Sequence, residues 1–387
     1  MVELSPLETL PPAVEKVAGE KAPAPLKLMA ARGMAPLRPG ELCTALYQLA
    51  VGEDAALKTA ALKTALELPE KILGAALAEP LDARVLDFFA RRLWQKPAQL
   101  EWVLLNKATA DETFRHLATL CAEAELEMIA KNEERLLRHP SIIAALYLNP
   151  KTRMSTAQRA LELAVRNGVK VEGIAAFDEA VAAIAQSGAR DADAEDAAFR
   201  RAAEVVVDGS AQLQLAAVDD QEAAALEAEE VARALAEVEG EVAPGSAAEV
   251  EEKKKRLEEL SPAAQIRAAT LGNSFARALL IRSRNKQVAM ACIKSPGVSD
   301  SEVLSYASNR GLDEEIIRFI AYKRQWLRLY AIKVALCNNP KCPLPTAMGL
   351  LPHLRPPELK TLARSKGISS VLASSAKQML QARGMGK

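Results

Sequence analysis

The sequence predicts an all-α protein, and three observations support this fold class. From Gly40 onward, apolar residues recur three or four positions apart, which is the period of an amphipathic helix, as in Leu42, Leu46 and Leu49. Good helix formers, namely Ala, Leu, Glu, Arg and Lys, dominate the composition. Alternating runs of Val, Ile and Thr, which would indicate strands, are almost absent.

The tail that precedes Gly40 differs from the rest of the chain. Residues 1–39 hold many prolines among Ala, Glu and Lys, and no apolar period there would form a helical face. We therefore expect residues 1–39 to be a flexible Pro/Ala-rich tail that serves as a spacer.

Self-similar turns indicate an internal repeat in the remainder. Each turn ends one apolar helix and opens the next: 104–109 around Asn106, 147–152 around Asn149, 293–298 around Ser295 and 337–342 around Asn339. The first pair of centres is 43 residues apart and the second pair 44, a spacing typical of helical repeats with two or three helices per unit. Asn tolerates the left-handed conformation that closes a helix, and a following Pro cannot continue it.

Small polar residues after these turns, such as Ser299 and Asp111, are expected to cap the next helix. The two C-terminal repeats are predicted to contain three helices each, at 299–306, 313–323 and 328–336, and then at 345–351, 356–363 and 369–380.

The sequences Asn149-Pro150-Lys151-Thr152 and Asn339-Pro340-Lys341-Cys342-Pro343, with Leu161, Ala164 and Leu350 after them, resemble leucine-rich-repeat-variant and HEAT or armadillo units. The resemblance covers residues 60–170 and 263–387, with a period nearer HEAT than the shorter variant. It implies α-solenoid halves, right-handed stacks of short helices that serve as binding scaffolds. The Cys-rich iron–sulfur segment of some variant-family proteins does not occur here, so no cofactor is expected. An irregular helical bundle is the alternative.

The net charge of zero hides a strong asymmetry. Residues 1–174 carry 22 basic and 22 acidic groups, residues 175–260 carry 8 and 22, and residues 261–387 carry 20 and 6. Together with the apolar pattern, this predicts an N-terminal helical-repeat domain at 40–186, an acidic, partly helical Ala/Glu-rich insertion or linker at 187–262, and a basic C-terminal helical-repeat domain at 263–387. Residues 187–260 are expected to contact and screen residues 263–387 until a stronger anionic partner displaces them.

Composition and motifs exclude several classes of protein. The longest uncharged stretches, 139–150 and 342–354, fall short of the roughly 18 residues of a membrane span, and no secretory signal opens the chain. Five scattered cysteines indicate a reducing compartment, so we expect a cytoplasmic protein.

Catalytic and metal-binding motifs are equally scarce. Phosphate-binding loops, His-Glu-x-x-His and Gly-x-Ser-x-Gly are missing, which predicts that the chain is not an enzyme. Cys337, Cys342 and His353 give the only hint of a metal site, but no fourth ligand is evident and Cys337 is expected to pack in the core.

The basic C-terminal region supplies the candidate site. Lys323 to Tyr330 interleaves cations with aromatic residues, which can pair with phosphates and stack on bases, although Trp326 and Tyr330 could instead pack in the core. Repeats would align such positions into a cationic stripe. The candidate residues for an anionic partner are Arg282, Arg284, Lys286, Lys323, Arg324, Trp326, Arg328, Arg355, Lys360, Arg364 and Lys366. A scaffold or adaptor that binds another protein is the leading interpretation, and nucleic-acid binding through 263–387 is the alternative.

Overall fold

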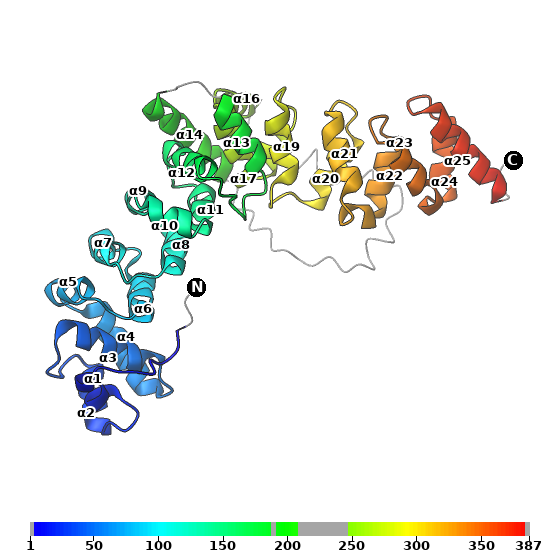
Figure 1. Ribbon diagram of the computed structural model, residues 1–387. Helices are drawn as coiled ribbons and strands as arrows, with labels where there is room; N and C mark the ends of the chain where they lie inside the picture. The colour runs from blue at the N-terminus through cyan, green and yellow to red at the C-terminus, as the bar shows by residue number, and fades with distance from the viewer. Residues whose placement is uncertain (1–3, 187–190, 208–246, 384–387) are drawn as a thin grey trace. The chain divides into compact units, whose positions relative to one another are not determined.

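A computed structural model describes residues 4–186, 191–207 and 247–383, and every regular element within these ranges is a helix (Figure 1). The predicted all-α class is therefore confirmed. The chain divides into two compact units, Met1–Ile174 and Ala175–Lys387.

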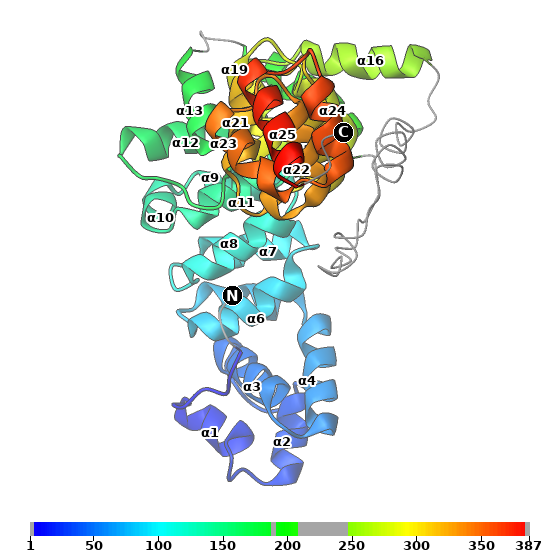
Figure 2. The ribbon, with the colours of Figure 1, turned by 90° about the vertical axis from the view of Figure 1, so that its right-hand side faces the viewer.

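The first unit is a succession of short helices. They are α1 (Pro12–Ala18), α2 (Ala24–Ala31), α3 (Pro39–Val51), α4 (Ala55–Glu67), α5 (Glu70–Ala78), α6 (Ala83–Leu93), α7 (Pro97–Leu105), α8 (Asp111–Leu120), α9 (Glu123–Ala130), α10 (Glu133–Arg138), α11 (Ser141–Leu148) and α12 (Met154–Arg166). Figure 2 shows α3, α6 and α8 following one another, and each packs on the next. Aromatic rings fill the interface of α3 with α6, where Tyr47 meets Phe88 edge to face at 5.5 Å between ring centroids.

The expected flexible tail is helical over part of its length. Helices α1 and α2 pack on α3, and Val14 and Ala30 are fully buried. Pro12 and Pro25 stand at the first turns of these helices, where a missing backbone N–H costs nothing. The prediction of a flexible tail is wrong for the described residues 4–39, because small residues provide a buried face that the search for large apolar residues overlooked.

The second unit continues with further short helices. They are α13 (Phe177–Gln186), α14 (Ala192–Val207), α16 (Ala247–Glu258), α17 (Pro262–Leu271), α18 (Ser274–Leu280), α19 (Lys286–Lys294), α20 (Asp300–Ser308), α21 (Glu314–Tyr322), the 3-10 helix η1 (Trp326–Arg328), α22 (Tyr330–Asn338), α23 (Leu344–Leu350), the 3-10 helix η2 (Leu351–His353), α24 (Pro356–Arg364) and α25 (Ser370–Ala382). The six helices predicted for the last two repeats correspond to α20 to α25 and are confirmed.

The boundary between the units lies earlier than expected. Helix α13, assigned from sequence to the first domain, packs on α17 and α19 in the second unit. Both flanks of the segment expected to be an acidic insertion also belong to this unit, because α14 and α16 pack on each other and on α18, with Phe199 and Leu257 buried. The middle of the insertion, 208–246, lies outside the described residues, and so does most of the expected contact between the insertion and residues 263–387.

The turn asparagines do not adopt the expected left-handed conformation. Asn106, Asn149 and Asn339 have φ values of −72°, −86° and −93°, so their backbone is extended. Each side-chain amide instead donates to two carbonyls at the end of an earlier helix, as Asn339 does to Ala307 O at 2.8 Å and Asn309 O at 3.2 Å.

The same side chains also hold their own turns. The Asn339 side-chain oxygen accepts from Lys341 N at 3.0 Å, and the other two asparagines accept in the same way. At the fourth turn a serine takes the place of the asparagine: the Ser295 hydroxyl donates to Thr270 O at 3.3 Å. The helix ends joined in this way are 25 to 32 residues apart, which is shorter than the spacing of 43 or 44 residues between the turns themselves.

The two predicted caps differ. Ser299 caps α20 through Glu302 N, and the Glu302 carboxylate accepts from Ser299 N at 2.8 Å, which completes a capping box. Asp111 is not a cap, because it is the first residue of α8 and instead pairs with Arg135 at 2.6 Å and Arg138 at 2.7 Å.

Candidate functional site

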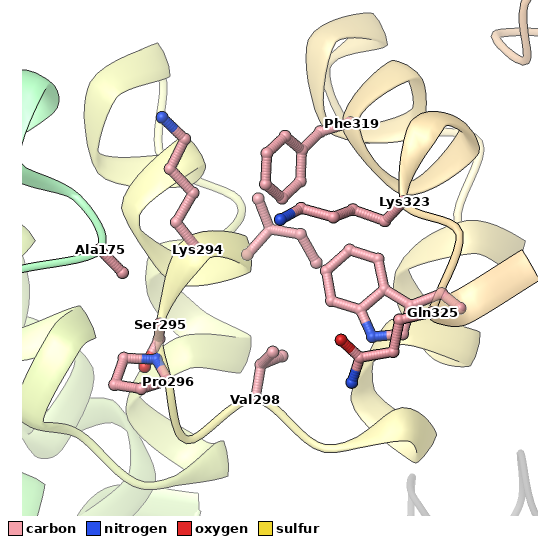
Figure 3. A pocket seen from close by; sticks show the side chains of 10 residues that line it. Ala175, Lys294, Ser295, Pro296, Val298, Phe319, Lys323 and Gln325 are labelled. Atoms are coloured by element: carbon pink, nitrogen blue, oxygen red, sulfur yellow. The ribbon is translucent and has the colours of Figure 1, made fainter. Parts of the chain in front are cut away.

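A pocket of about 350 Å³ opens where α19 and α21 end and η1 begins (Figure 3). Its lining is Ala175, Ile293, Lys294, Ser295, Pro296, Val298, Phe319, Lys323, Gln325 and Trp326. All of these residues belong to the second unit.

Aromatic and aliphatic side chains form the floor of the pocket. The buried face of α21 carries Ile316 and Ile320 into the core and leaves Phe319 half-buried on the pocket side. Phe319 meets Trp326 edge to face, with 6.0 Å between centroids and 65° between planes. Trp326 is only 6% exposed, because η1 turns its indole inward.

Two lysines flank the Phe319 ring. The Lys323 ammonium lies 5.1 Å from the ring centroid and the Lys294 ammonium 5.9 Å, both within cation–π range. Lys294 is paired with Glu179 of α13 at 2.6 Å, and Figure 3 shows its amine pointing away from the pocket while Lys323 extends across it. Lys323 is exposed and has no acidic partner among the described residues, so it is the cation available to a ligand.

The other predicted site residues separate into two groups. Arg282, Arg284 and Lys286 lie at the start of α19, opposite the end that borders the pocket. Arg364 is the last residue of α24 and Lys366 follows it, whereas Arg355 precedes the start of the helix. These positions do not form one continuous stripe.

We call the group around the pocket the pocket edge: the ends of α19 and α21, η1, and the starts of α22 and α24. Arg355 joins it because its backbone N–H donates to the Tyr330 hydroxyl at 2.9 Å, which brings the starts of α22 and α24 together. We call the other group the opposite edge. There Lys286 approaches Asp313 and Glu315 at 3.8 and 3.5 Å, and Arg310 lies against Gly367.

Cations on the pocket edge have few acids to pair with. Arg324 and Arg328 are exposed, and neither makes an ion pair within the described part of the chain. Lys360 is exposed on the middle of α24 and belongs to neither edge. The pocket edge thus combines an open pocket with Lys323, Arg324 and Arg328, which are accessible to an anionic partner.

The aromatic residues between these cations are not displayed for base stacking. Trp326 is buried, and the Arg355 guanidinium covers the Tyr330 ring at 4.9 Å. Tyr322, which the sequence interpretation did not include, is the exposed aromatic residue here, at 66%. Phe319 and Lys294 were also missed, although Phe319 lies four residues before Lys323 and therefore on the same helix face.

The cysteine and histidine candidates lie apart from this pocket. Cys337 is buried, and burial raises the pKa of its thiol to about 12, while burial raises the pKa of Cys342 to about 11. Thiols of this kind stay protonated, and the described residues contain no group of three or more His, Cys, Asp or Glu side chains arranged to hold a metal ion. Among the described helices, none has the length and apolarity that crossing a membrane requires.

Comparisons with known proteins give no family for this chain: no family model matches it, and no curated protein or solved structure matches it either.

Proposed function

We propose that this chain is a non-enzymatic scaffold or adaptor of the cytoplasm that binds another protein through the pocket edge of its second unit. The observation that carries the proposal is the pocket itself, an open pocket lined by aromatic, aliphatic and polar side chains and bordered by Lys323, Arg324 and Arg328, which lack acidic partners among the described residues. Five cysteines without disulfides fit the reducing compartment.

The proposal includes a HEAT-like stack of repeats in each unit. Two features support stacking: turn side chains that bond to earlier helix ends, and helices that pack on later neighbours, as α20 does on α22 and α22 on α24. A stack presents its helix ends in rows, and rows of this kind suit extended protein surfaces.

Nucleic-acid binding remains the second candidate, because Arg324 and Arg328 are exposed and could contact phosphates. Three features favour a protein partner instead: Trp326 is buried and Tyr330 is covered by Arg355, the cations are divided between two edges, and aromatic and aliphatic side chains line part of the pocket. A nucleic-acid complex would lose affinity steeply with salt, with a slope near −0.9 per phosphate contact on duplex DNA.

The test is affinity capture from native cytosol with the full chain, with and without nuclease. We expect a partner protein that survives nuclease, is lost with the triple variant Lys323→Glu, Arg324→Glu, Arg328→Glu, and is retained by the matched control Arg282→Glu, Arg364→Glu, Lys366→Glu. Capture that disappears with nuclease would establish the nucleic-acid alternative. Equal capture by both triple variants would show that the pocket edge is not the binding surface.

A further inference from the structure

The pocket has the chemistry of a receptor for one large apolar side chain. Ile293 and Trp326 are buried beneath it, Val298 is half-buried at its margin, and Phe319 exposes part of its ring. The apolar part of this lining gains free energy when an apolar group covers it, because apolar surface is then removed from water.

Three side chains of the pocket can donate hydrogen bonds to a ligand. Lys323 supplies an ammonium, Gln325 an amide and Trp326 an indole N–H, and none of these groups has an acceptor assigned among the described residues. A ligand that carries acceptors next to its apolar group would satisfy them. Carboxylates do so best, because hydrogen bonds from an ammonium to a carboxylate are charge-assisted.

Two further cationic side chains lie next to the pocket, one just before η1 and one at its end. Arg324 and Arg328 lie within a few residues of Trp326, are exposed, and pair with no acid in the described ranges. Acidic residues on either side of an apolar anchor would therefore find cations on the protein surface. Tyr322, which is exposed, directly precedes Lys323 in the chain.

We propose that this pocket binds an acidic protein segment by one large apolar, preferably aromatic, side chain that is flanked by Asp or Glu residues. The inference rests on the proposed function and specifies its partner. The apolar side chain enters between Phe319 and Val298, and the flanking carboxylates meet Lys323, Arg324 and Arg328.

A simpler role for the lysines leads to different results. Lys294 and Lys323 stand at helix C-termini, where positive charge offsets the helix dipole. If that were their whole role, Lys323→Ala would lower the stability of the protein slightly and leave peptide binding unchanged.

The experiment uses the full chain and fluorescein-labelled peptides. The probe is a glutamate peptide with one central phenylalanine, and the matched peptides replace that phenylalanine with alanine or every glutamate with lysine. We expect the phenylalanine peptide to bind about tenfold more tightly than the alanine peptide, which is the ratio that about 1.4 kcal/mol of side-chain burial gives. The lysine peptide should not bind.

Pocket-filling variants locate the site. Val298→Phe, and separately Ala175→Phe on the exposed rim, should abolish the preference for phenylalanine, whereas Val371→Phe at an exposed position of α25 should preserve it. Two rim positions are used so that loss of folding in one variant leaves the other informative.

Three results would overturn the inference. Equal affinity for the phenylalanine and alanine peptides would show that charge alone binds. An unchanged preference in both filled variants would place the anchor elsewhere. Displacement of the peptide by a thymidine oligonucleotide with equal affinity in wild-type and filled variants would assign the edge to phosphates. Each of these is distinguishable from failure of the proposed function, which is read from partner capture by the triple charge variants.

Discussion

Single side chains at the turns connect segments that are distant in sequence. Asn339 is 4% exposed and makes three hydrogen bonds, two as donor to Ala307 and Asn309 and one as acceptor from Lys341. Asn339→Ala should lower the free energy of unfolding by about 2 to 3 kcal/mol, because buried backbone groups lose their partner. Urea unfolding followed by circular dichroism measures the change.

The adjacent Asn338 is the control. Its amide donates to Val334 O within its own helix, so Asn338→Ala should cost well under half as much. Similar losses in both variants would contradict a special role for the turn asparagine.

For these turns, the sequence predicted the positions but not the hydrogen bonds. The self-similar sequences around Asn106, Asn149, Ser295 and Asn339 do lie between helices, but the left-handed backbone expected for Asn was wrong. Asn149 donates to the backbone carbonyls of Ala118 and Cys121, which lie 31 and 28 residues earlier. Because the acceptors are backbone atoms, no residue type in the sequence indicates where they are. A backbone acceptor at that distance becomes visible only once the helices are placed.

Between elements, a buried ion pair joins α18 to α20. Arg277 donates to the Glu302 carboxylate at 2.8 and 2.9 Å and to the carbonyls of Gly272 and Gly297, with both side chains at most 7% exposed. Arg277→Met should destabilise the protein by about 3 to 5 kcal/mol, because it leaves a buried carboxylate without its cation. Adding Glu302→Gln should restore part of this loss, since Gln can keep the capping box without a charge.

The matched control is the exposed Lys286, which is 61% exposed and lies 3.5 Å from Glu315. Lys286→Met should cost less than about 1 kcal/mol. If the double variant were no more stable than Arg277→Met alone, the loss would come from missing arginine contacts and not from the unpaired charge.

Elements with a strong apolar period were predictable, and elements without one were not. Helices α20 to α25 agree with the sequence prediction because each buries apolar residues spaced three or four positions apart. Helices α1 and α2 were not predicted, because their buried residues are largely alanine and because prolines in a sequence usually indicate the absence of a helix. The pocket was half-predicted: Lys323 and Trp326 were selected, but Lys294 and Phe319 reach it only through the packing of α19 against α21.

On the scale of the whole molecule, the last prediction concerns the unequal distribution of acidic and basic residues along the chain. Residues 208–246 contain ten acidic side chains and one basic side chain, whereas residues 261–387 carry 20 basic and 6 acidic. Removing all of 187–260 would also delete α14 and α16 with buried Phe199 and Leu257, so unfolding would obscure any effect of charge.

Changing the ten acids of 208–246 to Asn or Gln keeps the chain length and tests charge alone. We expect affinity for heparin to rise several-fold at low salt, because a competing anion for the basic surface is removed, and the gain to shrink near physiological ionic strength, where the Debye length is about 8 Å. Neutralising ten exposed acids of the first unit gives the same net charge and serves as the control. An equal rise in the control would mean that net charge alone governs heparin affinity, and an unchanged affinity in the 208–246 variant would show that this segment does not screen the basic unit.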